Sequence, residues 1–105
     1  MKILFRITVL SLAFLMWVPS VVHAQERSVM TYNIRYGSAN DADDSWDYRK
    51  ESLVREIAFY EPDFFGVQEA LHFQMEYLDS MLTQYAYIGV GRDDGKLQGE
   101  FSGIF

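Results

Sequence analysis

The amino-acid sequence predicts an α/β domain whose sheet is at least partly parallel. Segments with strand-like composition alternate with segments in which apolar residues recur at helical period, and this alternation is typical of α/β proteins. A helical stretch separates the first two strands, and a crossover of that kind joins parallel neighbours in a sheet. The expected order is strand, helix, strand, helix, strand, strand.

The first predicted strand covers residues 28–34, which are rich in Val, Ile, Thr and Tyr, residues that favour strands. A polar loop with Gly, Asn and Asp follows it. Ser45 suits the N-cap of a helix over residues 46–61. This helix is expected to end at Pro62, because the residue before a proline avoids the helical conformation.

The second half of the chain predicts the remaining strands and one more helix. Four consecutive apolar residues at 64–67 are typical of a strand that is buried on both faces. Apolar residues on one side predict a helix over residues 72–83. Residues 85–91 predict a third strand, the Asp-Gly pair at 94–95 marks a turn, and residues 101–105 begin a fourth strand.

Residues 1–24 have the pattern of a secretory signal peptide. Lys2 and Arg6 give a positive start, an apolar run follows, and the small residue Ala24 suits cleavage. The apolar run between Arg6 and Pro19 is short for a membrane-spanning helix. We therefore expect export to the periplasm or beyond, with cleavage near Ala24 and no stable membrane span afterwards; an uncleaved anchor is the alternative.

The remaining segment, residues 25–105, is expected to be a single acidic domain. Without the leader, seven basic and fifteen acidic residues give a net charge of −8, which argues against sequence-independent binding to nucleic acid or anionic membranes. The absence of cysteine excludes disulfides, thiolate metal sites and a cysteine nucleophile. The chain ends at Phe105 inside an apolar strand without a polar tail, so we expect a truncated domain.

Polar side chains follow the first two predicted strands. If these strands are parallel neighbours, Asn33 and Glu69 lie at the same carboxyl edge, where open α/β sheets bind ligands. Their oxygens suit Mg²⁺, Mn²⁺ or Ca²⁺. The simpler interpretations make Glu69 a helix-start carboxylate and Asn33 a turn residue. Arg35 either grips a phosphate in bidentate fashion or lies in solvent.

Two other groups of polar residues are weaker candidates. The acidic loop over residues 41–47 resembles part of a calcium loop but lacks the glycine and glutamate at EF-hand spacing. We interpret it as a solvated loop. His72 has no second histidine at ligand spacing.

Taken together, three segments resemble the endonuclease/exonuclease/phosphatase superfamily. They are "MTYNIRYG" at 30–37, "PDFFGVQEAL" at 62–71 followed by Gln74, and "GRDDGKLQGEFSGIF" at 91–105. The branch they resemble contains secreted bacterial, deadenylase-like members. The resemblance implies that residues 25–105 form the N-terminal portion of a four-layer α/β sandwich, a mixed sheet packed with helices. It also implies hydrolysis of phosphate ester bonds with Mg²⁺, or Mn²⁺ in its place.

The resemblance assigns roles to individual positions. Glu69 matches the metal-binding glutamate, and Asn33 matches a strand-end asparagine beside the metal and the scissile phosphate, so both are expected to be catalytic. Arg35 stands where other branches place an aspartate near the metal, and we expect it to contact substrate. Glu100 is a further candidate, from the glycine-glutamate-aromatic segment of this branch.

The resemblance leaves the substrate open. Phosphatase action on a small ester and nuclease action, including 3′–5′ exonuclease-like cleavage of nucleic acid, are both compatible with it. The family's later Asp-x-Asn and Asp-His motifs have no counterpart in the sequence, so the 105-residue chain is expected to be inactive by itself. The alternative is a non-catalytic exported protein that binds a ligand or a divalent ion. No sequence pattern indicates the oligomeric state.

Overall fold

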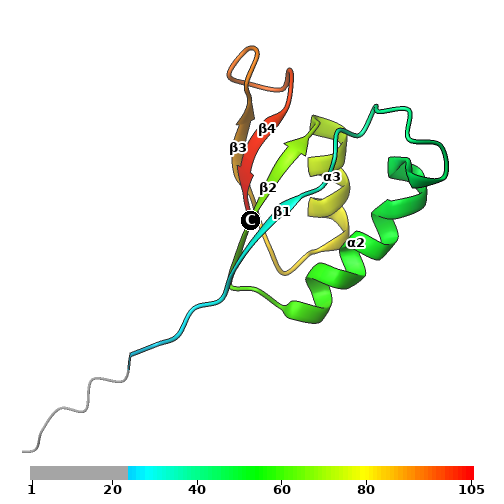
Figure 1. Ribbon diagram of the computed structural model, residues 1–105. Helices are drawn as coiled ribbons and strands as arrows, with labels where there is room; N and C mark the ends of the chain where they lie inside the picture. The colour runs from blue at the N-terminus through cyan, green and yellow to red at the C-terminus, as the bar shows by residue number, and fades with distance from the viewer. Residues whose placement is uncertain (1–23) are drawn as a thin grey trace, which may run out of the picture.

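A computed structural model describes residues 24–105, and the predicted signal peptide up to residue 23 lies outside the described residues. The predicted order of strands and helices is confirmed, with a short 3₁₀ helix added before the first α-helix (Figure 1). The elements are β1 (Val29–Asn33), η1 (Ala42–Asp44), α2 (Trp46–Tyr60), β2 (Phe64–Ala70), α3 (His72–Met81), β3 (Ile88–Gly91) and β4 (Phe101–Ile104).

The strands form one mixed sheet in the order β1-β2-β4-β3. β1 and β2 are parallel, as predicted, and their register places Asn33 beside Gln68. β4 is antiparallel to both of its neighbours. Consequently β1, β2 and β3 all run in the same direction, and their carboxyl ends lie at one edge of the sheet. The α/β fold class is therefore confirmed.

The two helices pack beside one face of the sheet (Figure 1). α2 contributes Leu53 and Ile57, one helical turn apart, and α3 contributes Met75 and Leu78 in the same way. The buried apolar core comprises Ile34, Trp46, Leu53, Ile57, Phe65, Val67, Ala70, Met75, Leu78, Leu82, Phe101 and Phe105. Neither helix of residues 24–105 is long and apolar enough to cross a bilayer.

The opposite face of the sheet is open. Phe65 and Val67 are buried, but Phe64 is 51% exposed, so the expectation of a strand buried on both faces is wrong. The physical reason is that no element of residues 24–105 covers this face. Its exposed large apolar residues are Val29, Phe64, Ile88, Val90 and Ile104. Several exposed apolar residues on one face of a sheet are typical of a face that packs against a further layer.

The ends of α2 largely follow the predicted signals. Ser45 is the N-cap residue, although its side chain makes no capping hydrogen bond. The helix ends at Tyr60, and Glu61 turns into the left-handed region with φ 44° directly before Pro62. A hydrogen bond also joins β1 to α2, because the hydroxyl of Tyr32 donates to the carboxylate of Glu56. Burial and this hydrogen bond raise the pKa of Tyr32 to about 12.

Candidate active site at the carboxyl edge of the sheet

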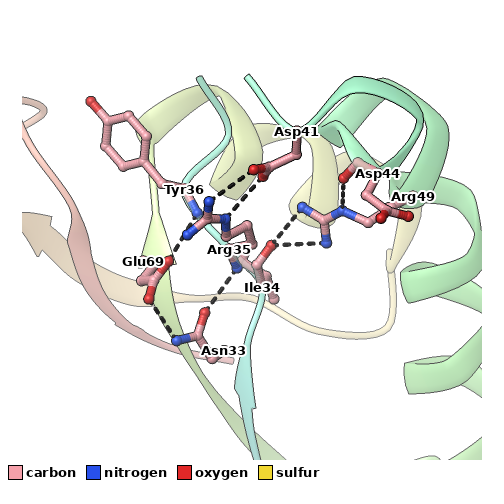
Figure 2. Close-up of polar contacts among 8 residues, drawn as sticks. All are labelled: Asn33, Ile34, Arg35, Tyr36, Asp41, Asp44, Arg49 and Glu69. Atoms are coloured by element: carbon pink, nitrogen blue, oxygen red, sulfur yellow. Dashed lines mark hydrogen bonds and ion pairs between the residues drawn. The ribbon is translucent and has the colours of Figure 1, made fainter. Parts of the chain in front are cut away.

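Asn33 and Glu69, both predicted as site residues, lie side by side at the ends of β1 and β2. Asn33 Nδ2 donates a hydrogen bond to Glu69 Oε1 at 2.8 Å, and the backbone N–H of Tyr36 donates to Glu69 Oε2 at 3.1 Å (Figure 2). The segment that leaves β1 therefore holds both oxygens of the Glu69 carboxylate.

These contacts keep the carboxylate ionised. The hydrogen bond from Asn33, and after it the N–H of Tyr36, hold the pKa of Glu69 below its ordinary value, and the positive charge of Arg35 acts in the same direction. The site therefore carries a fixed negative charge at neutral pH and in mildly acidic solution.

The backbone at Glu69 is specialised to present this side chain. The register between β2 and β4 shifts by one residue between Val67 and Ala70, which is a β-bulge, and Glu69 adopts φ 61°. In unbroken alternation residue 69 would face the helices, but Ala70 takes the buried position instead. Bulges and left-handed non-glycine residues concentrate next to active sites, where they re-aim side chains.

A buried amide joins the two strand ends. The Gln74 side chain is fully buried. Its Oε1 accepts hydrogen bonds from the backbone N–H groups of Gly37 and Leu71, both at 2.9 Å, and its Nε2 donates to the Arg35 carbonyl at 3.0 Å. Tyr36 lies between two of these partners, so Gln74 positions the N–H that reaches the carboxylate.

The sequence motif includes Gln74, but the sequence analysis did not predict that this side chain supports the site. The signal that could have found it is a glutamine directly before Met75 on the apolar side of a helix. Gly37 is matched to it, because a Cβ there would lie 2.5 Å from Gln74 Cδ. The close approach of this loop to α3 therefore requires glycine.

Arg35 is paired within its own loop. Its Nε and Nη2 donate to Asp41 Oδ2 and Oδ1 at 2.9 and 2.8 Å, and this contact raises the pKa of Arg35 and lowers that of Asp41. The acidic loop is thus partly an ion-pairing segment, and its ion pair lies at the exposed surface. Arg49 of α2 donates to the carbonyls of Ile34 and Asp44 and fixes the loop at both ends (Figure 2).

A pocket of about 640 Å³ opens on the uncovered face at this edge. Of the predicted site residues, Asn33, Glu69 and Glu100 line it, whereas Arg35 does not. Arg92, which the sequence analysis missed, is the one cationic side chain in its lining. The lining residues are Asn33, Gly66, Val67, Gln68, Glu69, Arg92, Glu100, Phe101, Ser102, Gly103 and Ile104.

The site offers the Glu69 carboxylate to a divalent cation, because Glu100, the other carboxylate in the pocket lining, pairs with Arg92. No group of three or more His, Cys, Asp or Glu side chains within residues 24–105 is gathered to hold a metal. Each Glu69 oxygen accepts one hydrogen bond, and a carboxylate has about four lone-pair sites, so acceptor capacity remains. This fits Mg²⁺, which often takes one or two protein carboxylates and fills its other positions with water and substrate phosphate.

The side chain of Asn33 is oriented to support Glu69. Its Oδ1 accepts a hydrogen bond from the Arg35 backbone N–H at 2.9 Å, while its amide nitrogen faces the carboxylate. Turning the amide over would place oxygen against oxygen and N–H against N–H, so the network fixes this orientation. In this arrangement Asn33 does not offer an oxygen beside Glu69.

Solved structures of bacterial proteins match the chain in fold and sequence. An endonuclease/exonuclease/phosphatase from Bacteroides vulgatus has a TM-score of 0.75 and 41% identity, over 78% of this chain and 31% of that one. A mannosyl-6-phosphatase from Bacteroides thetaiotaomicron has a TM-score of 0.73 and 38% identity, over 76% of this chain and 31% of that one. An endonuclease/exonuclease/phosphatase family protein from Bacteroides thetaiotaomicron has a TM-score of 0.72 and 38% identity, over 75% and 29%.

The chain spans about a third of the length of these proteins. No protein-family model and no curated protein matches it. The resemblance drawn from the sequence is confirmed by the structural matches.

Proposed function

The chain belongs, in fold and in sequence, with the endonuclease/exonuclease/phosphatase proteins, and on that premise we propose that it contributes to a divalent-metal-dependent phosphoester hydrolase. The observation that carries this proposal is the Glu69 carboxylate, held by Asn33 and the Tyr36 N–H at the rim of a pocket. Mg²⁺ is usually bound by one or two protein carboxylates together with substrate phosphates, and Glu69 fits the protein's part of such a site.

Glu69 is the residue that would hold the cation, Mg²⁺ or Mn²⁺, and the ion would supply Lewis-acid polarisation of a phosphoryl oxygen. Asn33 and the Tyr36 N–H orient the carboxylate and keep it ionised. Gln74 keeps the loop that carries this N–H against α3. We expect residues 25–105 by themselves to show no turnover, because hydrolysis also needs a positioned nucleophile and a base.

A compact phosphate ester is the substrate class that we favour. The relative named as a mannosyl-6-phosphatase is a phosphatase of this fold. The aromatic ring of Phe101 in the pocket lining is buried, so the lining presents no exposed platform on which bases would stack. The acidic charge of residues 25–105 also disfavours a long polyanion. Exonuclease-like cleavage of nucleic acid therefore has less support.

We further propose that the protein acts outside the cytoplasm, on the strength of the leader pattern in residues 1–24. Mass spectrometry of the protein recovered from the periplasm or medium tests this proposal. An N-terminus at Gln25 supports cleavage after Ala24, and an intact N-terminus in the membrane fraction supports the uncleaved anchor.

The central experiment measures phosphate release from a sugar 6-phosphate, and release of the alcohol from a chromogenic phosphodiester, by the protein expressed from its full reading frame. Glu69→Gln is expected to lower metal-dependent turnover about a hundredfold or more, since loss of one key electrostatic group has effects of that size. Glu51→Gln, on an exposed glutamate of α2, is the matched control and should leave turnover unchanged.

Full activity of Glu69→Gln would show that the site is wrong. Absence of metal-dependent turnover in all three proteins would favour the non-catalytic binding protein.

A further inference from the structure

A third strand ends at the same edge as β1 and β2. β3 runs in their direction, and its last residue, Gly91, pairs with Phe101 of β4, which in turn pairs with Ala70 of β2. Arg92 follows Gly91 directly. It thus stands at the end of β3 as Asn33 and Glu69 stand at the ends of β1 and β2. The carboxylate of Glu69 and the guanidinium of Arg92 therefore both line the pocket at this edge of the sheet.

The hairpin between β3 and β4 holds the backbone of Arg92 in place. The Arg92 N–H donates to the Glu100 carbonyl at 3.0 Å, and the Asp93 N–H donates to the Gln98 carbonyl at 3.0 Å. Gly99 adopts φ 79°, and a Cβ there would lie 2.5 Å from the Asp93 carboxylate. The hairpin is therefore closely packed, and Arg92 projects from a framework that is anchored on both sides.

The Arg92 side chain keeps donors available for a ligand. Its Nη1 contacts Glu100 Oε2, and its Nε lies 3.5 Å from Asp93 Oδ1. Its Nη2 has no hydrogen-bond partner among residues 24–105, and the side chain is 65% exposed. Arg35, by contrast, is gripped by Asp41 through two hydrogen bonds and lies outside the pocket lining. Arg92 is the arginine that faces the pocket with free donors.

The charges of the pocket make this cation necessary for an anionic ligand. Glu69 and Glu100 both line the pocket, and Arg92 is the one cation in the lining, so without Arg92 the protein groups of the lining would repel a phosphate. A guanidinium presents N–H groups in a planar fork that matches phosphate oxygens, and it remains charged at every relevant pH.

We propose that Arg92 binds the phosphate of the substrate, and that Glu100 orients the Arg92 guanidinium toward the pocket. This inference rests on the proposed function and deepens it, because it places a compact phosphate monoester between the β2 end and the β3–β4 hairpin. It moves the phosphate-binding role from Arg35, where the sequence placed it, to a residue of the third strand end.

The test uses the protein expressed from its full reading frame. It measures binding of inorganic phosphate by calorimetric titration, without metal and with Mg²⁺, and the KM and kcat for a sugar 6-phosphate. Arg92→Ala is expected to weaken phosphate binding about tenfold or more, because it removes hydrogen bonds to a charged group. It should also raise KM more than it lowers kcat. Arg92→Lys should be intermediate, since it keeps the charge and loses the fork. Arg55→Ala, on an exposed arginine of α2, is the control and should bind phosphate as the unmodified protein does.

The variant Glu100→Gln separates two effects of Glu100: its contact with the Arg92 guanidinium and its negative charge in the pocket. Glutamine keeps an acceptor for Arg92 and removes one negative charge from the pocket, so phosphate should bind about two- to threefold more tightly, on the scale of an exposed charge interaction. Weaker binding by Glu100→Gln would contradict the charge argument. Thermal denaturation of each variant establishes that it is folded.

The outcomes for the two proposals are distinguishable. If Arg92→Ala keeps the phosphate affinity and KM of the unmodified protein while Glu69→Gln loses turnover, the Arg92 inference is overturned and the hydrolase stands. If no protein turns over substrate but Arg92→Ala loses phosphate affinity, the phosphate site stands and the hydrolase proposal fails. An unmodified protein that does not bind phosphate in the millimolar range would overturn the Arg92 inference.

Discussion

The two faces of the four-stranded sheet differ in what covers them: the helices pack over one face, and no element of residues 24–105 covers the other. Phe65 and Val67 of β2 point into the core under the helices, while Gly66 and Gln68 between and beyond them line the open pocket. Because successive side chains of a strand point to opposite faces, β2 contributes to the core and to the pocket lining at the same time. The bulge at Glu69 is the point where the pattern breaks, and there a residue due to face the core is aimed at the pocket edge instead.

The largest expected difference between the two faces is in the free energy of unfolding, measured on two neighbouring phenylalanines that lie on opposite faces. Phe65→Ala removes a fully buried ring that stacks on Phe105 at a centroid distance of 4.6 Å, and we expect it to lower the free energy of unfolding by about 3–5 kcal/mol. Phe64→Ala, on the exposed face, should lower it by less than about 1 kcal/mol. Urea unfolding of the expressed chain measures both. Equal losses would mean that both faces are packed in solution.

A smaller effect is expected from two glutamines that differ in burial. Gln74→Leu leaves two backbone N–H groups and one carbonyl without their partner inside the protein, and should lower the free energy of unfolding by about 1–3 kcal/mol. It should also raise the Mg²⁺ concentration needed for half-maximal turnover, because the Tyr36 N–H loses its position. Gln84→Leu, on an exposed glutamine outside the pocket lining, should do neither to a comparable extent. A Gln74→Leu protein with unchanged metal dependence would restrict that residue to a structural role.

The smallest expected effect is a shift along the pH axis. The pKa of Glu69 is lowered in the folded protein, so its ionised carboxylate favours folding above its ordinary pKa, and this contribution is lost as pH falls through the folded-state value. Asn33→Ala removes the principal cause of the lowering. The acid limb of the kcat/KM profile should therefore move to higher pH. Asn40→Ala, an exposed loop residue, is the control, and equal profiles for both variants would refute the role of Asn33.

Much of the fold was predictable because its signals are local. The strand-helix-strand order, the end of α2 before Pro62 and the parallel pairing of β1 and β2 follow from composition, period and crossover length. The proximity of Asn33 and Glu69 followed from that pairing alone. The resemblance to known proteins added the chemistry expected at this edge.

The remaining features depend on contacts between distant segments. The bulge that presents Glu69 arises from the register with β4, about thirty residues further on, and has no local signal. The partner of Arg35 depends on how its loop folds back, and the place of Arg92 depends on β3 joining the sheet through β4. The open face was mispredicted because an apolar run does not reveal whether one or both of its sides are covered.

The most direct test of the central claim, that Glu69 is the carboxylate through which this edge holds a divalent cation, is Mn²⁺ binding measured by electron paramagnetic resonance. The protein from the full reading frame, its Glu69→Gln variant and its Glu51→Gln control would be titrated side by side. We predict that Glu69→Gln weakens Mn²⁺ binding about tenfold or more, within the range for disturbed metal sites, while Glu51→Gln matches the unmodified protein. Equal Mn²⁺ affinity in all three proteins would contradict the account and leave Glu69 a carboxylate that only joins two strand ends.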